Sequence, residues 1–251
     1  MTVQPESVAV VSPHLDDAVL SCGRVLAAHP GSHVVTVFTG GPAHVWRLPA
    51  WDRSSGIFSP GANVMQVRRS EDDAALGVLD ARAERLGLWD SQYRGRASVL
   101  SRLTRRLPAP GPDDDQLADT IAGRVETLAR SLGSHRWLIP LGLVHRDHLI
   151  TAAACRRVAT RMPELEWVAY EELPYAAESP ELVAEALSRL ADAGWQSEPA
   201  TLEVAGDAAP KEAAVQCYRS QSAALGPRRD LAVHSPEAYH RLRATSDGGQ
   251  R

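Results

Sequence analysis

The amino-acid sequence predicts an α/β fold, in the form of a Rossmann-like three-layer αβα sandwich around a mostly parallel sheet. Short continuous apolar runs alternate along the chain with stretches of helical periodicity, and such runs are typical of parallel strands that helices cover on both faces. The 251 residues, 44% of them hydrophobic, are enough to build a core. No internal repeat or low-complexity block divides the chain, so we expect one domain over residues 1–251. Antiparallel strands toward the carboxyl end are compatible with this fold.

The amino-terminal part begins with a predicted βαβ unit. Residues 8–12 and 33–39 are apolar, β-branched runs, and residues 18–28 between them can be helical. The polar segment 40–61 carries Gly, Pro and Trp residues and is too long for an ordinary connection, so we expect a functional loop or lid there. The unit is followed by a predicted helix at 64–79 and a predicted third strand at 85–89.

The rest of the chain continues this alternation. The Pro/Gly/Asp-rich residues 107–115 predict a surface loop that ends at the cap of a helix. Beyond this loop we expect helices at 115–132, 149–162, 180–193 and 209–221, strands at 137–141 and 167–170, and an extended segment at 196–204. Residues 240–251 are expected to form a frayed tail.

Composition and charge argue against several classes of protein. The formal net charge is -4 and the basic residues are scattered, which argues against a nucleic-acid partner. No apolar run approaches the roughly 20 residues of a membrane-spanning helix, and the amino end lacks the pattern of a signal peptide. The three cysteines form no CxxC pair, so neither a disulfide framework nor a thiolate zinc site is indicated. We therefore expect a cytoplasmic protein that acts on a small molecule without membrane insertion; whether it forms a homo-oligomer stays open.

The first motif with chemical content is the hexapeptide SPHLDD at positions 12–17, directly after the first predicted strand. Doubly wound folds bind their ligands at this edge of the sheet. His14 and Asp17, at spacing i and i+3, could reach one cation. The alternative is that Asp16 or Asp17 caps the following helix, although capping does not require His14 as well.

The second motif is the tetrapeptide HRDH at positions 145–148, after the strand predicted at 137–141. Two histidines and an aspartate in four residues are unusual outside a metal or proton-transfer site, the alternative being a polar helix start with imidazoles in solvent. Both motifs come to the same edge of the predicted sheet. Together they offer the two nitrogens and one oxygen that a catalytic zinc uses while keeping a position open for water.

These two motifs resemble those of the LmbE-like, or PIG-L, family of zinc-dependent N-deacetylases. The resemblance extends over most of the chain through the shorter stretches VRRSE at 67–71, LGLWD at 86–90, YEELP at 170–174, and Lys211 with YRSQ at 218–221. The chain departs from the family at Leu15, where proline is usual, and at Ala18, where an acidic residue is common. Some members also carry a tyrosine where this chain has Leu143.

The resemblance implies a role for each residue of the two motifs. The implied ligands of one zinc ion per chain are His14, Asp17 and His148. Asp16 would then be the general base that takes a proton from the attacking water. His145 would help to stabilise the oxyanion, with Asp147 orienting its imidazole and favouring the protonated form. Either Asp16 or a protonated His145 could supply the proton to the departing amine.

Arg68 and Asp90 match family positions that contact the sugar hydroxyls, and both are of a suitable chemical type. The alternative for Arg68 is a solvated salt bridge with Glu71 or Asp72 on its own helix. Four aromatic side chains in or near the neighbouring loops could stack on a saccharide or pack in the core: Trp46, Trp51, Phe58 and Tyr93.

We therefore predict a zinc hydrolase that removes an N-acetyl group from a GlcNAc-type amino sugar of a soluble glycoconjugate or natural-product intermediate, such as an antibiotic precursor. One alternative is an amidase that cleaves a larger N-acyl group from a thiol-sugar conjugate. A second is a non-catalytic Rossmann-like binding module, but no GxGxxG follows the first strand and the loop there is rich in His and Asp. A site with two histidines and one aspartate could also hold Fe(II).

Overall fold

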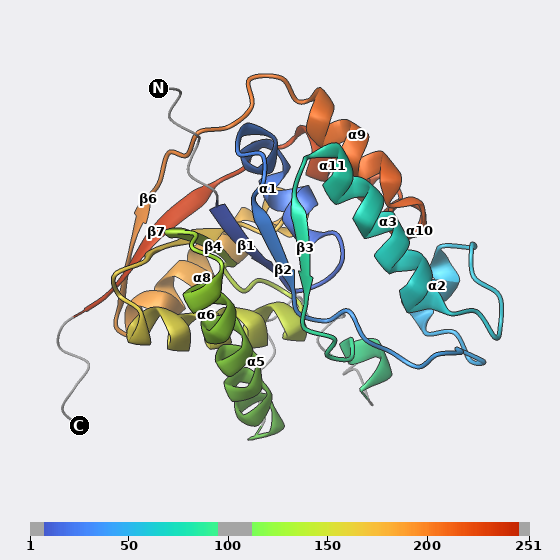
Figure 1. Ribbon diagram of the computed structural model, residues 1–251, viewed down its shortest axis with the longest axis horizontal. Helices are drawn as coiled ribbons and strands as arrows, with labels where there is room; N and C mark the ends of the chain where they lie inside the picture. The colour runs from blue at the N-terminus through green and yellow to red at the C-terminus, as the bar shows by residue number, and fades with distance from the viewer. Residues whose placement is uncertain (1–7, 95–111, 246–251) are drawn as a thin grey trace.

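The computed structural model describes residues 8–94 and 112–245, and Figure 1 shows a central sheet between layers of helices. Its seven strands are β1 (Val8–Ser12), β2 (His33–Thr36), β3 (Arg82–Arg85), β4 (Arg136–Pro140), β5 (Glu166–Tyr170), β6 (Trp195–Pro199) and β7 (Tyr239–Ala244). They are ordered β3-β2-β1-β4-β5-β7-β6. All pairs from β3 to β5 are parallel, whereas β7 is antiparallel to both β5 and β6. The predicted fold class, with antiparallel strands toward the carboxyl end, is confirmed.

Helices cover both faces of the sheet. The helices are α1 (Asp17–Ala28), α2 (Ala50–Ser54), α3 (Val64–Val78), α5 (Pro112–Ser131), α6 (Arg146–Arg161), α7 (Tyr175–Glu178), α8 (Pro180–Asp192), α9 (Ala209–Cys217), α10 (Arg219–Leu225) and α11 (Arg228–His234), with the 3-10 turn η1 at Ser91–Tyr93. In one layer α9 packs on α1 and α3, and in the other α5 packs on α6 (Figure 1).

Burial on both faces explains the uninterrupted apolar strands. Every residue of β1 and β2 is buried, as are the last four of β4 and of β5. Residues 8–11 are fully inaccessible to solvent. A strand in this position has no solvent-facing side, so its sequence shows no polar alternation.

The order of the strands creates a crevice at the carboxyl edge of the sheet. From β1 the chain moves outward through β2 to β3, and from β4 it moves the opposite way to β5. The connections that follow the adjacent strands β1 and β4 therefore leave toward opposite helix layers. Such a topological switch point is where open α/β sheets bind their ligands. Both motifs found in the sequence lie here.

The structure differs from the predicted elements in three places. The third strand lies at 82–85 rather than 85–89, because the polar, half-exposed edge strand β3 carries no apolar run to mark it. The helix predicted at 209–221 is two helices, α9 and α10, which meet at Tyr218. Residues 240–244 are not frayed but belong to β7, which hydrogen-bonds to a strand on each side. Residues 107–111 and 246–251 lie outside the described part of the chain.

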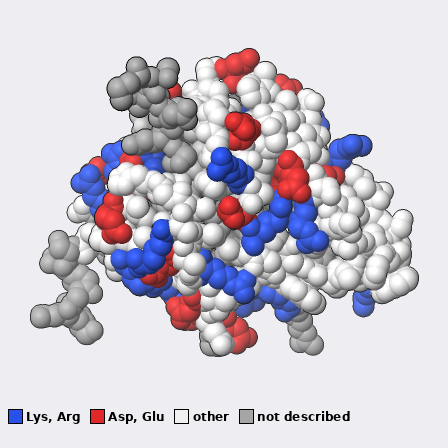
Figure 2. All heavy atoms as spheres, in the orientation of Figure 1, with Lys and Arg blue, Asp and Glu red and all other residues white. Residues whose placement is uncertain are grey.

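The surface of the described residues agrees with a chain of mixed charge. Figure 2 shows basic and acidic side chains interspersed on the face that it displays. No helix among residues 8–94 and 112–245 is both long and apolar enough to cross a membrane.

Candidate metal and active site

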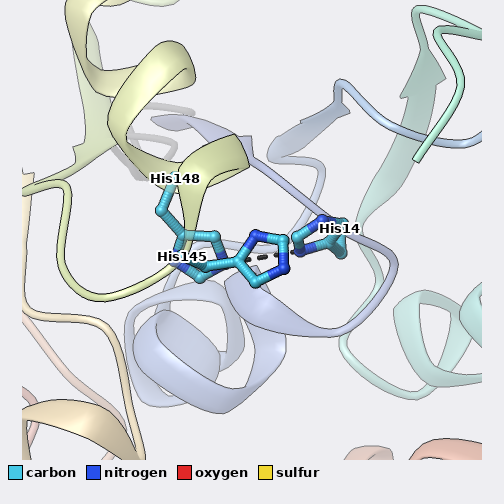
Figure 3. Close-up of side chains that lie close together, drawn as sticks. All are labelled: His14, His145 and His148. Atoms are coloured by element: carbon cyan, nitrogen blue, oxygen red, sulfur yellow. Dashed lines mark hydrogen bonds between the residues drawn. The ribbon is translucent and has the colours of Figure 1, made fainter. Parts of the chain in front are cut away.

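The two motifs meet where the connection after β1 faces the start of α6. Nδ1 of His14 and Nε2 of His148 each lie 3.2 Å from Oδ2 of Asp17, and the two nitrogens are 3.3 Å apart. Figure 3 shows His14 and His148 turned toward each other, with His145 beside them. Ligand atoms of a tetrahedral zinc site, at bonds of about 2.0–2.1 Å, are about 3.3 Å apart. The three atoms therefore fit one tetrahedral cation.

Hydrogen bonds of Ser12 and Asp17 shape the loop that carries the first motif. The Ser12 hydroxyl donates to the His14 carbonyl at 2.6 Å and accepts the Ala18 N–H at 3.0 Å. The His14 N–H donates to Oδ2 of Asp17 at 2.8 Å. Asp16 occupies the N-cap position of α1, yet its side chain makes no capping hydrogen bond. The capping alternative for Asp16 is thus not supported, and its carboxylate lines the pocket described below.

Two further carboxylates hold the histidines from behind. Oδ2 of Asp147 lies 3.1 Å from Nε2 of His14, and Oε1 of Glu172 lies 3.3 Å from Nδ1 of His148. A proton on each of these ring nitrogens leaves Nδ1 of His14 and Nε2 of His148 free to bind a cation. This arrangement is typical of histidine metal ligands, whose second nitrogen donates to a carboxylate. Glu172 was given no role by the sequence, although it stands just after β5 at the same edge of the sheet.

The Asp147 carboxylate does not contact the His145 ring, and Asp147 reaches that imidazole through its backbone N–H instead. The Asp147 carboxylate points inward, where it accepts hydrogen bonds from the Ser91 N–H at 3.0 Å and from Arg94 as well as contacting His14. Only its backbone N–H reaches His145, donating to Nδ1 at 3.2 Å. His145 is the N-cap of α6, and this bond leaves the proton of the neutral ring on Nε2.

The predicted protonated form of His145 is also not supported. Burial, followed by repulsion from the neighbouring imidazole of His14, lowers the pKa of His145 to about 4. The attraction of Asp147 is too weak to reverse this effect. His145 is therefore neutral near pH 7 and can act as a hydrogen-bond donor through Nε2, without a positive charge.

Carboxylates dominate the electrostatics of the ligand cluster. Burial opposes a charge on His148, but Asp17 and Glu172 outweigh it and raise its pKa to about 9. The pKa of His14 is raised for the same reason, since its bonds to Asp147 and Asp17 exceed the cost of burial. A site that draws protons onto its imidazoles in this way also suits a divalent cation, whose charge takes the place of those protons.

Asp16 has the properties of a proton acceptor that works near neutral pH. Burial and the adjacent Asp17 carboxylate raise the pKa of Asp16 to about 7. A general base is most effective when its pKa lies near the operating pH. The two adjacent aspartates thus differ in environment: Asp17 contacts both imidazoles, and Asp16 faces the cavity.

The ligand cluster opens into a cavity of about 510 Å³. Of the residues predicted for the site, those that line it are His14, Asp16, Asp17, Arg68, Asp90 and His145. Lining residues to which the sequence analysis gave no role include Gln92, Tyr175, Gln221 and Arg228. The last three come from α7, α10 and α11, which fold back over the sheet edge from far along the chain. Only the stretches at 170–174 and 218–221 gave a signal near them.

The alternative for Arg68, a solvated salt bridge with Glu71 or Asp72, is not found. Its Nη2 lies 2.5 Å from Oδ1 of Asp52 on α2, and its Nη1 lies 3.7 Å from Asp90. Glu71 instead bonds to Ser220, and Asp72 bonds to Arg85 and Tyr218.

Since Arg68 is only 5% exposed, the ion pair is buried. It connects α3 to the segment 40–61, and the hydroxyl of Tyr93 donates to the second oxygen of Asp52 at 2.8 Å. Arg68 and Asp90 thus line the cavity, and they are also part of the contacts that hold its wall.

The aromatic residues separate into two groups. Trp51 lines the cavity and its Nε1 donates to Oε1 of Gln221 at 2.8 Å. Trp46 is 76% exposed and is not among the lining residues. Tyr93 helps to hold the wall of the cavity through its hydrogen bond to Asp52. Of the four aromatic residues considered from the sequence, Trp51 is therefore the one that lines the cavity, together with Phe38 and Tyr175.

Comparison with known proteins identifies the family. The sequence matches PIG-L, described as GlcNAc-PI de-N-acetylase, over residues 9–159. The chain belongs to this family. It is 32% identical over 181 residues to the 2'-N-acetylparomamine deacetylase of Streptomyces fradiae, an alignment that covers 67% of this chain and 57% of that protein. This chain thus spans little more than half of the length of that relative.

Solved structures agree with this membership. A zinc-inhibited form of teicoplanin deacetylase Orf2 aligns with a TM-score of 0.74 at 25% identity, over 96% of this chain and 99% of the other. The N,N'-diacetylchitobiose deacetylase of Pyrococcus horikoshii shares the fold, with a TM-score of 0.52 at 12% identity over 95% of this chain and 84% of the other. The resemblance predicted from the sequence is confirmed, and the relatives are deacetylases.

Proposed function

We propose that this chain is a zinc-dependent hydrolase that removes an acetyl group from the nitrogen of an amino sugar in a soluble glycoconjugate or natural-product intermediate. The observation that carries the proposal is the triangle of ligand atoms from His14, Asp17 and His148, with the uncapped carboxylate of Asp16 beside it. The relatives named above act on amino sugars or on teicoplanin, and this supports the substrate class.

In this proposal His14, Asp17 and His148 would hold one zinc ion. As a Lewis acid, the bound ion would make water more acidic and polarise the amide carbonyl. Asp16 accepts the proton of the attacking water. His145 donates from Nε2 to the developing oxyanion, in a tautomer that its bond to the Asp147 N–H maintains. Asp16 then returns its proton to the departing amine, because a neutral His145 has no surplus proton to give.

Arg68, Asp90 and Trp51 are proposed to hold the sugar. The guanidinium offers a forked donor, the carboxylate accepts from vicinal hydroxyls, and the indole gives an apolar face for stacking. The cavity of about 510 Å³ also has room for an acyl group larger than acetyl. The competing amidase activity is therefore tested together with the deacetylase.

The test measures amine release from N-acetylglucosaminides by the protein loaded with one equivalent of zinc, with and without a chelator. One equivalent is used because a solved relative is described as zinc-inhibited. We expect chelator-sensitive release of free amine, and a loss of about 10²–10⁴ in kcat for Asp16→Asn at unchanged zinc content. An Asp16→Asn variant that keeps zinc and the parent rate would refute the mechanism.

Two further measurements complete this design. Asp119→Asn makes the same chemical change at an exposed carboxylate that pairs with Arg157, and it should leave kcat unchanged. A series of N-acyl glucosaminides of increasing acyl length separates the two activities. A higher kcat/KM for acetyl supports the deacetylase, whereas a maximum at a longer acyl group would replace it by the amidase.

A further inference from the structure

A second cavity lies between α5, α6 and α8. It measures about 280 Å³ and has no lining residue in common with the metal pocket. Its apolar wall is made of Ala118, Leu141, Leu149, Ile150, Ala152, Ala153, Ala186 and Leu190. These side chains come from three helices and the end of β4, so the cavity is a gap between packed elements rather than a fold of one loop.

Five charged residues complete the lining, and four of them have contacts inside the protein. Arg146 pairs with Asp114 at 2.7 Å. Asp115 pairs at the same distance with Arg157, which is not itself a lining residue. Arg189 donates to the carbonyl oxygen of Gly142 at 3.1 Å.

Arg156 is the fifth charged residue and has no such contact. Among the described residues no hydrogen bond or ion pair to its guanidinium is found, although the side chain is half-buried in the cavity wall. Burial and the nearby Arg189 lower the pKa of Arg156 to about 10, so it remains charged near pH 7. A half-buried cation next to an apolar wall, with both nearby carboxylates already paired, is complementary to an external anion.

We propose that this cavity binds an anionic amphiphile, specifically a medium-chain carboxylate, whose apolar chain lies along Leu149, Ala153 and Leu190 and whose carboxylate pairs with Arg156. The guanidinium presents a planar fork that matches a carboxylate with two parallel hydrogen bonds. The volume suits a small ligand and is too small for a folded partner. The proposal does not depend on the proposed deacetylase activity, because neither the metal nor its ligands take part.

Calorimetric titration of the zinc-loaded protein with octanoate tests this site. We expect saturable binding at one site, weakened about tenfold or more in Arg156→Gln, since a hydrogen-bonded charge pair is lost. Arg161→Gln is the matched control on the same helix, because that side chain pairs with Glu126 and neither residue lines the cavity. Its affinity for octanoate should equal that of the parent.

Two more arms keep the result specific. Ala186→Phe fills the cavity from α8, on a different helix from Arg156, and should abolish binding, while far-ultraviolet circular dichroism confirms that the variant is folded. Chelation of zinc should leave octanoate binding unchanged. Equal affinity in Arg156→Gln, no binding to the parent, or loss of binding on chelation would each overturn the proposal, the last because it would assign the carboxylate to the metal pocket.

Discussion

Two buried clusters of charged residues in this protein differ in whether their charges are balanced within the cluster. In the metal cluster, four carboxylates surround the imidazoles of His14, His145 and His148: Asp16, Asp17, Asp147 and Glu172. In the second cluster, Nζ of Lys211, the only lysine of the chain, lies 2.9 Å from Glu237, and both side chains are nearly inaccessible.

In the second cluster the positive charge of Lys211 is balanced by the negative charge of Glu237, and both side chains are buried from solvent. The Tyr239 hydroxyl donates to Oε2 of Glu237 at 2.6 Å, and the backbone N–H of Arg24 donates at 3.0 Å to Oε1, the oxygen that also pairs with Lys211. The metal cluster has an excess of acidic groups and opens into a cavity. The comparison teaches that burial of charge alone does not mark a functional site, whereas a buried cluster that lacks a counter-charge and can be reached from solvent does.

The largest effect is expected when the metal cluster loses one of its three ligands. Asp17→Asn keeps the size of the side chain but removes the charge next to His14 and His148, so zinc binding should be lost and kcat/KM should fall about 10³-fold or more. Zinc content by elemental analysis and amine release are the measurements. Full zinc occupancy in Asp17→Asn would contradict the assignment of the ligand.

A substitution in the second cluster, Lys211 with Glu237, should instead lower the stability of the protein. Glu237→Ala leaves the Lys211 ammonium buried without its partner, so the free energy of unfolding should fall by about 3–5 kcal/mol. Urea unfolding measures this loss, and zinc content per folded molecule should not change. The double variant Lys211→Met with Glu237→Leu should recover most of the stability. A loss of zinc in folded Glu237→Ala would erase the distinction between the clusters.

Removal of a carboxylate that supports a ligand histidine should weaken zinc binding less than removal of a ligand itself. Glu172→Gln retains an oxygen that can accept the N–H groups of Gly142 and Leu143, both at 2.9 Å, but it weakens the bond that orients His148. Zinc affinity should fall about 10–100-fold. Competition with a chromophoric chelator gives this affinity. Asp147→Asn tests the equivalent contact to His14, and unchanged affinity in both variants would show that these carboxylates do not support the ligands.

The smallest effect is expected at the sugar-binding wall. Arg68→Lys keeps the positive charge near Asp52 but loses the fork that could reach a hydroxyl at the same time, so KM for an N-acetylglucosaminide should rise about tenfold with little change in kcat. Steady-state kinetics separate the two parameters. Arg130→Lys, on the exposed face of α5, is the control and should be neutral. A fall in kcat alone would move Arg68 from binding to catalysis.

The sequence by itself determined the central strands and the two motifs. β1 and β4 are recognisable because burial on both faces requires continuous apolar residues, a property that local sequence records directly. His14, Asp16 and Asp17 stand within four residues of one another, as do His145 and His148, so their proximity needs only the strand-to-helix connections. The parallel sheet then brings the two short segments to one edge.

Only the tertiary structure decided the contacts between distant segments. Glu172 supports His148 from just after β5, and Asp52, within the segment 40–61, pairs with Arg68 on α3. Neither contact leaves a periodic or local signal in the sequence. The same holds for β7: residues 239–244 become a strand because unpaired backbone groups of β5 and β6 accept them on both sides. Side-chain direction at a helix start was likewise beyond the sequence, and it is why the Asp147 carboxylate contacts His14 while only its backbone N–H reaches the ring of His145.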